Sequence, residues 1–345
     1  MRRPFPTNAK PRSARLLAIA VVQLLAFLLA PVAAGDFERP IPAGGGPTVI
    51  HSAMGVLDVD DINDASQNFT INLFALFQWD DPREAHSGKG KITKELGDVW
   101  HPHLFFSNMQ RTWSSFGGDV VISPSGGVAL RQQFWGDFSQ PMFLHDFPFD
   151  EQKFEIRVVA AGPEEFEEIK FVQNPDIPSF VAETYSVADW KVLGSGVSMA
   201  PLIFPNGRST DSYTFSFTAK RLSNHHLIKN IAPLLMIVIL SWVVFWLDPK
   251  DGGTQLGVAV TSFLTMIAYH VALKSTLPEI SYLTRLDVFV FGATLLVFFA
   301  MIEVVVTTGL ARTDRVARAR RLDLICIFAF PSALALIALY AFVWH

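Results

Sequence analysis

The chain has 345 residues, half of them hydrophobic, and a formal net charge of −4. This length is sufficient for two domains, and the absence of a block of basic residues argues against a nucleic-acid partner. The single cysteine, Cys326, excludes an internal disulfide. We expect no cofactor and no metal site.

Residues 1–34 are predicted to form a secretory signal peptide. Basic residues precede the apolar run 16–30, and small residues follow it, in a pattern suited to cleavage after about Ala34. A first membrane anchor is the alternative, but the apolar run is short for one. We therefore expect the following domain to be exported, to the periplasm of a bacterium.

Residues 35–226 are predicted to form an antiparallel β-sandwich of the immunoglobulin-like kind. They contain many short strand-like runs, such as 69–79 and 153–159, without intervening helical patterns. The alternation is clear where Tyr213, Phe215 and Phe217 are separated by polar residues.

The third part, residues 227–345, is predicted to be a transmembrane domain. It contains four apolar runs of about 20 residues, which is the length a helix needs to cross a bilayer. Five arginines lie close to the link between the third and fourth runs, and the positive-inside rule places them in the cytoplasm. The β-domain is then outside, in a multi-pass protein of the bacterial inner membrane. The predicted spans are 227–247, 254–273, 286–308 and 322–344.

The second span carries more polar and small residues than the others. Five positions with spacings of four and three fall on one stripe of a helix: Gly257, Thr261, Leu264, Ala268 and Val271. Several copies of this stripe around an axis would line a pore, in which a ring of Leu264 could act as an apolar gate. Tight packing of helices within one bundle explains the same pattern, and periodicity alone does not decide between them.

Four short motifs are spread along the chain: "WDDPR" at 79–83, "WHPHL" at 100–104, "FPFDEQ" at 147–152, and "STLPEISYLT" at 275–284. In their order and spacing they resemble motifs of the pentameric ligand-gated ion channels, specifically the bacterial members that lack the disulfide. Phe154 stands where animal members have a cysteine. The resemblance covers about residues 47–345 and implies a homopentamer in the membrane lipid, with a pore for ions lined by the second span.

The resemblance also implies residues that couple the β-domain to the membrane domain. They meet where the "FPFDEQ" loop presses on the helices: Asp64, Phe149, Asp150, Arg221 and Pro278. A desolvated arginine needs a carboxylate partner, and two arrangements of such a network form a switch. The alternative is that Asp150 and Arg221 only hold the domains together.

Family ligands bind between adjacent subunits in a box of aromatic residues. The corresponding positions in this chain are Phe74, Ser107, Ala161, Phe204 and Tyr213. Ser107 and Ala161 replace two of the aromatic residues, which disfavours a quaternary amine. The agonist is therefore an unknown small molecule or protons. A role in core packing explains Phe74 equally well.

Asp251 and Gln255, at the start of the second span, are the predicted selectivity residues. Five copies of Asp251 would concentrate monovalent cations at the inner mouth, although Lys250 and Lys274 oppose this. An anion-selective channel and a non-conducting periplasmic sensor are the alternatives. An enzyme is not expected, because no His-Glu-x-x-His, Gly-x-Ser-x-Gly or phosphate-binding loop is present.

Overall fold

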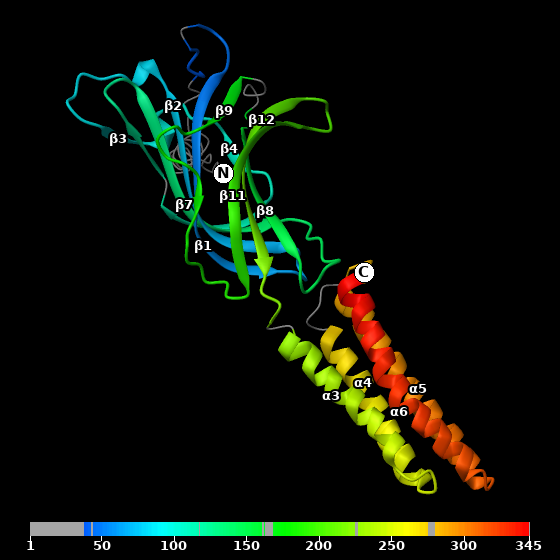
Figure 1. The fold of residues 1–345 in the computed structure, drawn as a ribbon. Helices are drawn as coiled ribbons and strands as arrows, with labels where there is room; N and C mark the ends of the chain where they lie inside the picture. The colour runs from blue at the N-terminus through cyan, green and yellow to red at the C-terminus, as the bar shows by residue number, and fades with distance from the viewer. Residues whose placement is uncertain are drawn as a thin grey trace, which may run out of the picture.

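A computed structural model describes seven stretches of the chain: residues 38–42, 44–116, 118–160, 162, 168–224, 227–274 and 280–344. The predicted signal peptide and two predicted site residues, Ala161 and Pro278, lie outside these stretches. The β-domain and the helical domain follow one another along an elongated molecule (Figure 1).

Two sheets form the β-domain. The first has the strand order β10-β1-β2-β7-β6-β3, with β5 paired to β7 and β9 paired to β1; the second has the order β11-β12-β8-β4. The first sheet contains β1 (Thr48–Asn63), β2 (Asn68–Asp80), β3 (Ile92–Glu95), β5 (Met109–Phe116), β6 (Asp119–Ile122), β7 (Gly127–Ser139), β9 (Ile169–Gln173) and β10 (Phe180–Val181). The second contains β4 (Leu104–Phe106), β8 (Glu151–Ala160), β11 (Trp190–Ile203) and β12 (Ser209–Arg221).

The first sheet is mixed, whereas the sequence predicted a purely antiparallel sandwich. β9 and β10 both pair with β1 in the parallel direction. The chain leaves β8 in the second sheet and joins the free edge of β1 in the first, so it runs alongside β1 rather than back against it. Local sequence patterns reveal hairpins between consecutive strands. They do not reveal the parallel pairing of β9 and β10 with β1, because these strands are far apart in the chain.

The core between the sheets is rich in phenylalanine. Phe154 and Phe217 lie on neighbouring strands of the second sheet and stack with ring centroids 5.1 Å apart, and Phe69 from the first sheet meets the edge of Phe154 at 5.0 Å. All three side chains are buried. Such aromatic pairs add to the stability that burial of their large apolar surfaces provides, and they hold the two sheets together without a disulfide.

The second half of the chain forms four helical segments that are long and apolar enough to cross a membrane. Their parts are η3 (Leu227–Ile231), α3 (Ala232–Trp242), η4 (Val243–Trp246), α4 (Gly252–Lys274), α5 (Arg285–Arg312), α6 (Val316–Leu339) and η5 (Tyr340–Trp344). The third and fourth helices are longer than the predicted spans. Arg318, Arg320 and Arg321 consequently lie inside α6 rather than in a link.

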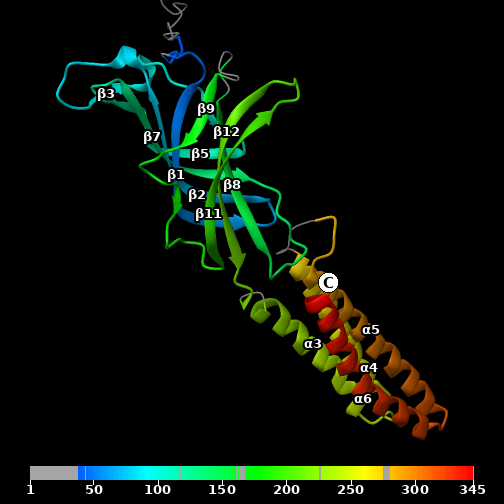
Figure 2. The same ribbon diagram turned by 45° about the horizontal axis from the view of Figure 1, so that its top comes forward.

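The four segments run alternately away from and towards the β-domain. Figures 1 and 2 show α3 leading away from the sheets, with the α3–α4 and α5–α6 links at the far end of the bundle. The chain end marked C returns to the junction between the two domains. This arrangement agrees with the predicted topology, in which both ends of the helical domain are on the same side of the membrane.

Candidate ion pathway and domain junction

Helix α4 has two different faces. Its buried face carries Gln255, Ala259, Ser262 and Met266, each of them at most 1% exposed. The positions predicted to line a pore all lie on the exposed side, where Leu264 is 59% and Val271 is 66% exposed; the others are Gly257, Thr261 and Ala268. The predicted stripe is therefore the side of α4 that its own bundle leaves uncovered.

The hydroxyl groups of Thr261 and Thr265, on the exposed side of this helix, are bonded to its own backbone. Thr261 Oγ1 donates to the carbonyl of Gly257 at 2.8 Å, and Thr265 Oγ1 donates to the carbonyl of Thr261 at 2.7 Å. A threonine bonded in this way remains stable on an apolar helix because its proton is satisfied locally. Its oxygen lone pairs stay free to accept hydrogen bonds from water or to face a cation.

Gln255, predicted as a selectivity residue, points into the bundle rather than to the exposed side of α4. Gln255 is 0% exposed. Its amide nitrogen donates to the carbonyls of Val244 at 3.1 Å and Leu247 at 3.3 Å. Gln255 lies four residues before Ala259 and so shares the buried face of α4. It ties the start of α4 to the end of the preceding helix.

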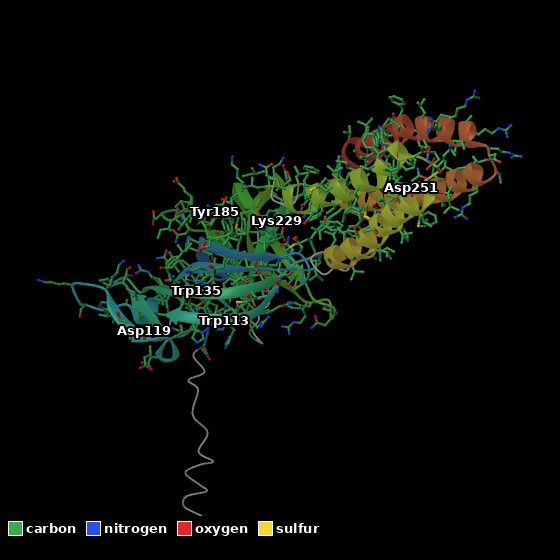
Figure 3. All side chains as sticks on the ribbon, turned by 90° about the horizontal axis from the view of Figure 1, so that it is seen from below. Trp113, Asp119, Trp135, Tyr185, Lys229 and Asp251 are labelled. Atoms are coloured by element: carbon green, nitrogen blue, oxygen red, sulfur yellow. The ribbon has the colours of Figure 1, made fainter. Side chains whose placement is uncertain are left out.

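Asp251 directly precedes α4 and is exposed. Its carboxylate accepts from the backbone N–H of Thr254 at 3.4 Å, which places the negative charge at the N-terminus of the helix. Figure 3 shows Asp251 among the helices, away from Trp113 and Trp135 in the β-domain. Asp251 is therefore exposed at the end of α4 that lies far from the β-domain.

A second carboxylate, Asp248, lies in the same link. It forms an ion pair with Arg320 at 3.4 Å and accepts from the backbone N–H of Lys250 at 3.1 Å. This backbone hydrogen bond, aided by the charge of Arg320, lowers the pKa of Asp248. Asp248 is thus engaged with α6, whereas Asp251 faces outward.

At the junction of the two domains, Arg221 binds two carboxylates. Its Nε donates to Asp150 Oδ1 at 2.8 Å, and its Nη2 donates to Asp64 Oδ1 at 2.7 Å and to Asp150 Oδ2 at 3.3 Å. Arg221 is 3% and Asp150 is 2% exposed. Arg221 ends β12, Asp150 precedes β8, and Asp64 follows β1, so three separate parts of the β-domain meet on one guanidinium group.

The surroundings of Arg221 make this cluster strongly dependent on its charges. The guanidinium carbon lies 4.2 Å from the ring centroid of Trp190 and 4.9 Å from that of Phe147, in cation–π contact. Burial alone would lower the pKa of Arg221, but the hydrogen bonds and charges of the two aspartates outweigh it and raise the pKa. For Asp64 burial is the largest effect, and it raises the pKa despite the attraction of Arg221.

The loop before β8, residues 143–150 and here named the FPF loop, docks on the start of α5. The backbone N–H groups of Arg285 and Leu286 donate to the carbonyls of His145 and Phe147, at 3.0 and 3.3 Å. Arg285 also forms an ion pair with Asp146 at 2.7 Å. The FPF loop is thereby attached to the helical domain through the backbone and through charge.

Aromatic contacts complete this junction. The His145 ring stacks on Tyr282 with centroids 3.9 Å apart, and the Tyr282 hydroxyl accepts from the backbone N–H of Leu144 at 3.0 Å. Phe149, 36% exposed, meets the edge of Phe342 in η5 at 5.8 Å. The FPF loop therefore contacts both the segment before α5 and the end of the last helix.

Sequence reasoning missed Tyr282 and Arg285 as members of the junction. A sequence signal was present, because Thr284 and Asp287 form a capping box that fixes the start of α5. This cap places Arg285 in the first turn, where its side chain reaches Asp146 and its Nη1 donates to the carbonyl of Phe342 at 3.0 Å. The predicted partner Pro278 lies outside the described residues.

The predicted ligand-binding residues are not brought together within one chain. Phe74 lies on β2 in the first sheet, half-buried against Leu76 and Ala129. Ser107 follows β4 and Phe204 follows β11, so both belong to the second sheet. Ser107 is exposed and Phe204 is half-buried. Phe74 therefore lies on a different sheet from the strands that precede Ser107 and Phe204.

Tyr213, also predicted for the ligand site, lies inside the β-domain rather than on its surface. Its side chain is 0% exposed, and its hydroxyl forms a 2.7 Å hydrogen bond with Ser179 Oγ. The side chain lies in the core between the sheets together with Phe215. Ala161, the remaining predicted position, lies outside the described residues.

Comparisons with known proteins agree with these features. The model of the neurotransmitter-gated ion-channel ligand-binding domain matches residues 34–191, and the model of the transmembrane region of the same channels matches residues 230–315. A proton-gated ion channel of Gloeobacter violaceus is 24% identical over 345 residues, which cover 95% of each chain. Subunit beta-4 of the gamma-aminobutyric acid receptor of Gallus gallus is 24% identical over 268 residues, 75% of this chain and 55% of the chicken protein. With both of its domains matched in order, the chain belongs to the neurotransmitter-gated ion-channel family, a family of ligand-gated membrane channels rather than enzymes.

Proposed function

We propose that five copies of this chain form a channel in which α4 lines the pore, and that a ligand bound between adjacent β-domains opens it to monovalent cations. The observation that carries the proposal is the uncovered face of α4. Leu264 and Val271 are large apolar residues that the bundle leaves more than half exposed. In a ring of five subunits this face of α4 would line a shared central pore, which one subunit alone cannot form.

The side chains on this face suit a gated water path. Thr261 would form a ring of hydroxyl oxygens, and Leu264, about one turn further towards the β-domain, would form an apolar ring. An apolar constriction can stop ions by dewetting without closing completely. Small shifts of α4 would then be enough to wet the path and let ions through.

The cluster around Arg221 and the FPF loop would carry the signal between the domains. It links the β-domain to the first span, which follows β12 directly, and the FPF loop contacts both α5 and η5. Packed interfaces of this kind change between discrete arrangements rather than deforming gradually. Ligand binding between β-domains would favour one of these arrangements.

The agonist is proposed to bind between Phe74 of one subunit and the Ser107 and Phe204 region of its neighbour. Protons are a second candidate, because a relative is named a proton-gated ion channel. Liposomes containing the purified channel would distinguish the two through ion flux after pH steps and after addition of small amines and acids. A response only to the added compounds would exclude protons as the agonist.

The cation preference is proposed to come from Asp251. Its carboxylate is exposed at the start of α4, whereas Asp248 is paired with Arg320. Five such carboxylates would attract cations to the inner mouth. An anion-selective channel is the alternative, and the reversal potential under a salt gradient separates the two. We further propose that the channel lies in a bacterial inner membrane with its β-domain in the periplasm.

Cysteine accessibility tests the pore assignment. In a Cys326→Ala background, Thr261→Cys is expected to react with a water-soluble, charged thiol reagent and to lose current. The matched control is Ser262→Cys, the next residue, whose side chain is 0% exposed within its own bundle. Equal modification of the two variants, or modification of Thr261→Cys without any change in current, would contradict a pore along this face.

A further inference from the structure

Two acidic residues face each other inside the helical bundle, away from the exposed face of α4. Glu303 lies on α5 and is 7% exposed, and Asp323 lies on α6 and is 4% exposed. Cys326, three residues after Asp323 on α6, lies in one buried cluster with Ala300 and Val304, which flank Glu303 on α5, so the two acids lie at the same level of the α5–α6 contact. Acidic side chains within membrane-spanning helices are costly, and they seldom serve only as packing.

The surroundings of this pair are apolar. Cys326 on α6 packs in one cluster with Ala300 and Val304 on α5, and this cluster includes Ala259 of α4 and the η4 side chains Val244 and Phe245. Among the residues that the structure describes, no donor forms a hydrogen bond with either carboxylate oxygen of Glu303 or with Oδ1 of Asp323. These three oxygens are also closed off from solvent.

The charged and titratable groups nearby do not neutralise the pair. Arg320 attracts Asp323 and Asp248 repels it, but the guanidinium of Arg320 is 65% exposed and forms its ion pair with Asp248. Cys326 is a buried free cysteine one turn after Asp323 on the same helix, and its protonated thiol carries no charge. The indole N–H of Trp242, which packs against the same cluster, is buried without a hydrogen-bond partner in the described chain and does not reach either carboxyl.

We propose that Glu303 and Asp323 form an intramembrane proton-binding site that holds one proton shared between their two carboxyl groups. Two carboxylates close together in an apolar setting do not both remain ionised, and a single proton binds to the pair rather than to one fixed residue. The bound proton supplies one O–H donor, which can bond to an oxygen of the other carboxyl group. The site joins α5 to α6, and it does not depend on the identity of the agonist or on the lining of the pore.

Infrared spectroscopy of the full-length channel in lipid tests this site directly. At neutral pH the wild type is expected to show the carbonyl stretch of a protonated carboxylic acid. Glu303→Gln and Asp323→Asn should each lose this band, because an amide then donates to the remaining carboxylate. Glu303→Asp retains two carboxyl groups and should retain the band. Asp146→Asn, which alters a 57% exposed side chain, is the matched control and should leave the band unchanged.

A wild-type spectrum without the band at neutral pH would overturn the proposal, whatever the variants do. A band that persists in both amide variants would overturn it as well. If the amide variants do not assemble, wild type with ¹³C in the side-chain carboxyls of aspartate and glutamate decides the matter. The band must then shift with one or both labels, and it must remain when Asp287, the other described acid in α5, is replaced by asparagine.

Discussion

At the scale of single residues, the Arg221 cluster is the part of the junction most sensitive to substitution. Arg221→Ala would leave Asp150, 2% exposed, without its cation. Removal of one partner from a buried ion pair costs about 3–5 kcal/mol. Thermal unfolding of the solubilised channel should show a large loss of stability. Arg320→Ala, which removes an exposed pair with Asp248, should cost much less, because exposed ion pairs contribute little to stability. Equal losses in the two variants would contradict this account.

Asp64 gives a second prediction at this scale, concerning pH. Burial raises the pKa of Asp64 in the folded protein, so the folded state holds the proton more tightly than the unfolded state. The stability from this group is fully present below the unfolded pKa of about 3.9 and is lost as pH rises through the folded pKa. Asp64→Asn should remove this component from the stability curve measured against pH.

Asp146→Asn is the control for Asp64→Asn, because Asp146 is also paired with an arginine but is 57% exposed. Its pH curve should follow the wild type in the same window. If Asp64→Asn also follows the wild type there, proton binding at Asp64 is not linked to folding.

Residue identity alone misled the sequence analysis at two positions. Gln255 and Tyr213 carry polar groups that suit an ion path or a ligand site, yet both are 0% exposed. In each case a local partner satisfies the polar group: backbone carbonyls for Gln255 and Ser179 for Tyr213. A sequence shows which groups need a partner but not which partner lies nearby. By contrast, Asp150 and Arg221 were predicted to lie together, and they do.

At the scale of elements, the period of α4 carried more information than its composition. The stripe from Gly257 to Val271 was predicted from spacing, and the structure leaves all five positions exposed. Helix ends were less predictable. Helix α5 continues past its apolar run to Arg312, and α6 begins before its apolar run, at Val316. Polar residues can continue a helix outside the bilayer, so hydropathy marks the membrane rather than the helix.

The apolar ring proposed at Leu264 belongs to this scale. Leu264→Ala should make the channel easier to open, because the shorter alanine side chains leave a wider and less apolar constriction, which wets more readily. Recordings should show opening at lower agonist concentration or openings without agonist. Ile267→Ala is the matched control, since Ile267 is an exposed apolar residue of α4, 43% exposed, that lies off the stripe. Leu264→Ala behaving like the wild type would remove Leu264 as the gate.

The FPF loop makes contacts with the helical domain that the sequence analysis did not predict. The predicted contact of the loop was Pro278, whereas the described contacts run to Tyr282, Arg285 and Phe342. Phe342 lies near the end of the last helix, almost two hundred residues from the loop. Without an alignment or a structure, a pair this distant in the chain leaves no local pattern to find.

At the scale of the whole molecule, the proposed ion selectivity depends on further copies of the chain around one axis. A single exposed carboxylate at Asp251 has little effect in water, because its field is screened within about 8–10 Å at physiological salt. Several copies around one axis act together at the narrow mouth of the path. The effect of removing the charge should therefore be much larger on permeation than on folding.

Asp251→Asn should consequently shift the reversal potential, measured under a salt gradient, towards the value for an unselective pore. The loss of negative charge at the mouth lowers the local cation concentration, while asparagine keeps the ability to cap α4 through its side-chain oxygen. Asp248→Asn is the matched control from the same link, because Asp248 is already paired with Arg320. It should change selectivity less than Asp251→Asn does. An unchanged reversal potential in Asp251→Asn would exclude Asp251 from the selectivity filter. A wild-type reversal potential that indicates anion preference would replace the proposed cation channel by the alternative, an anion-selective channel.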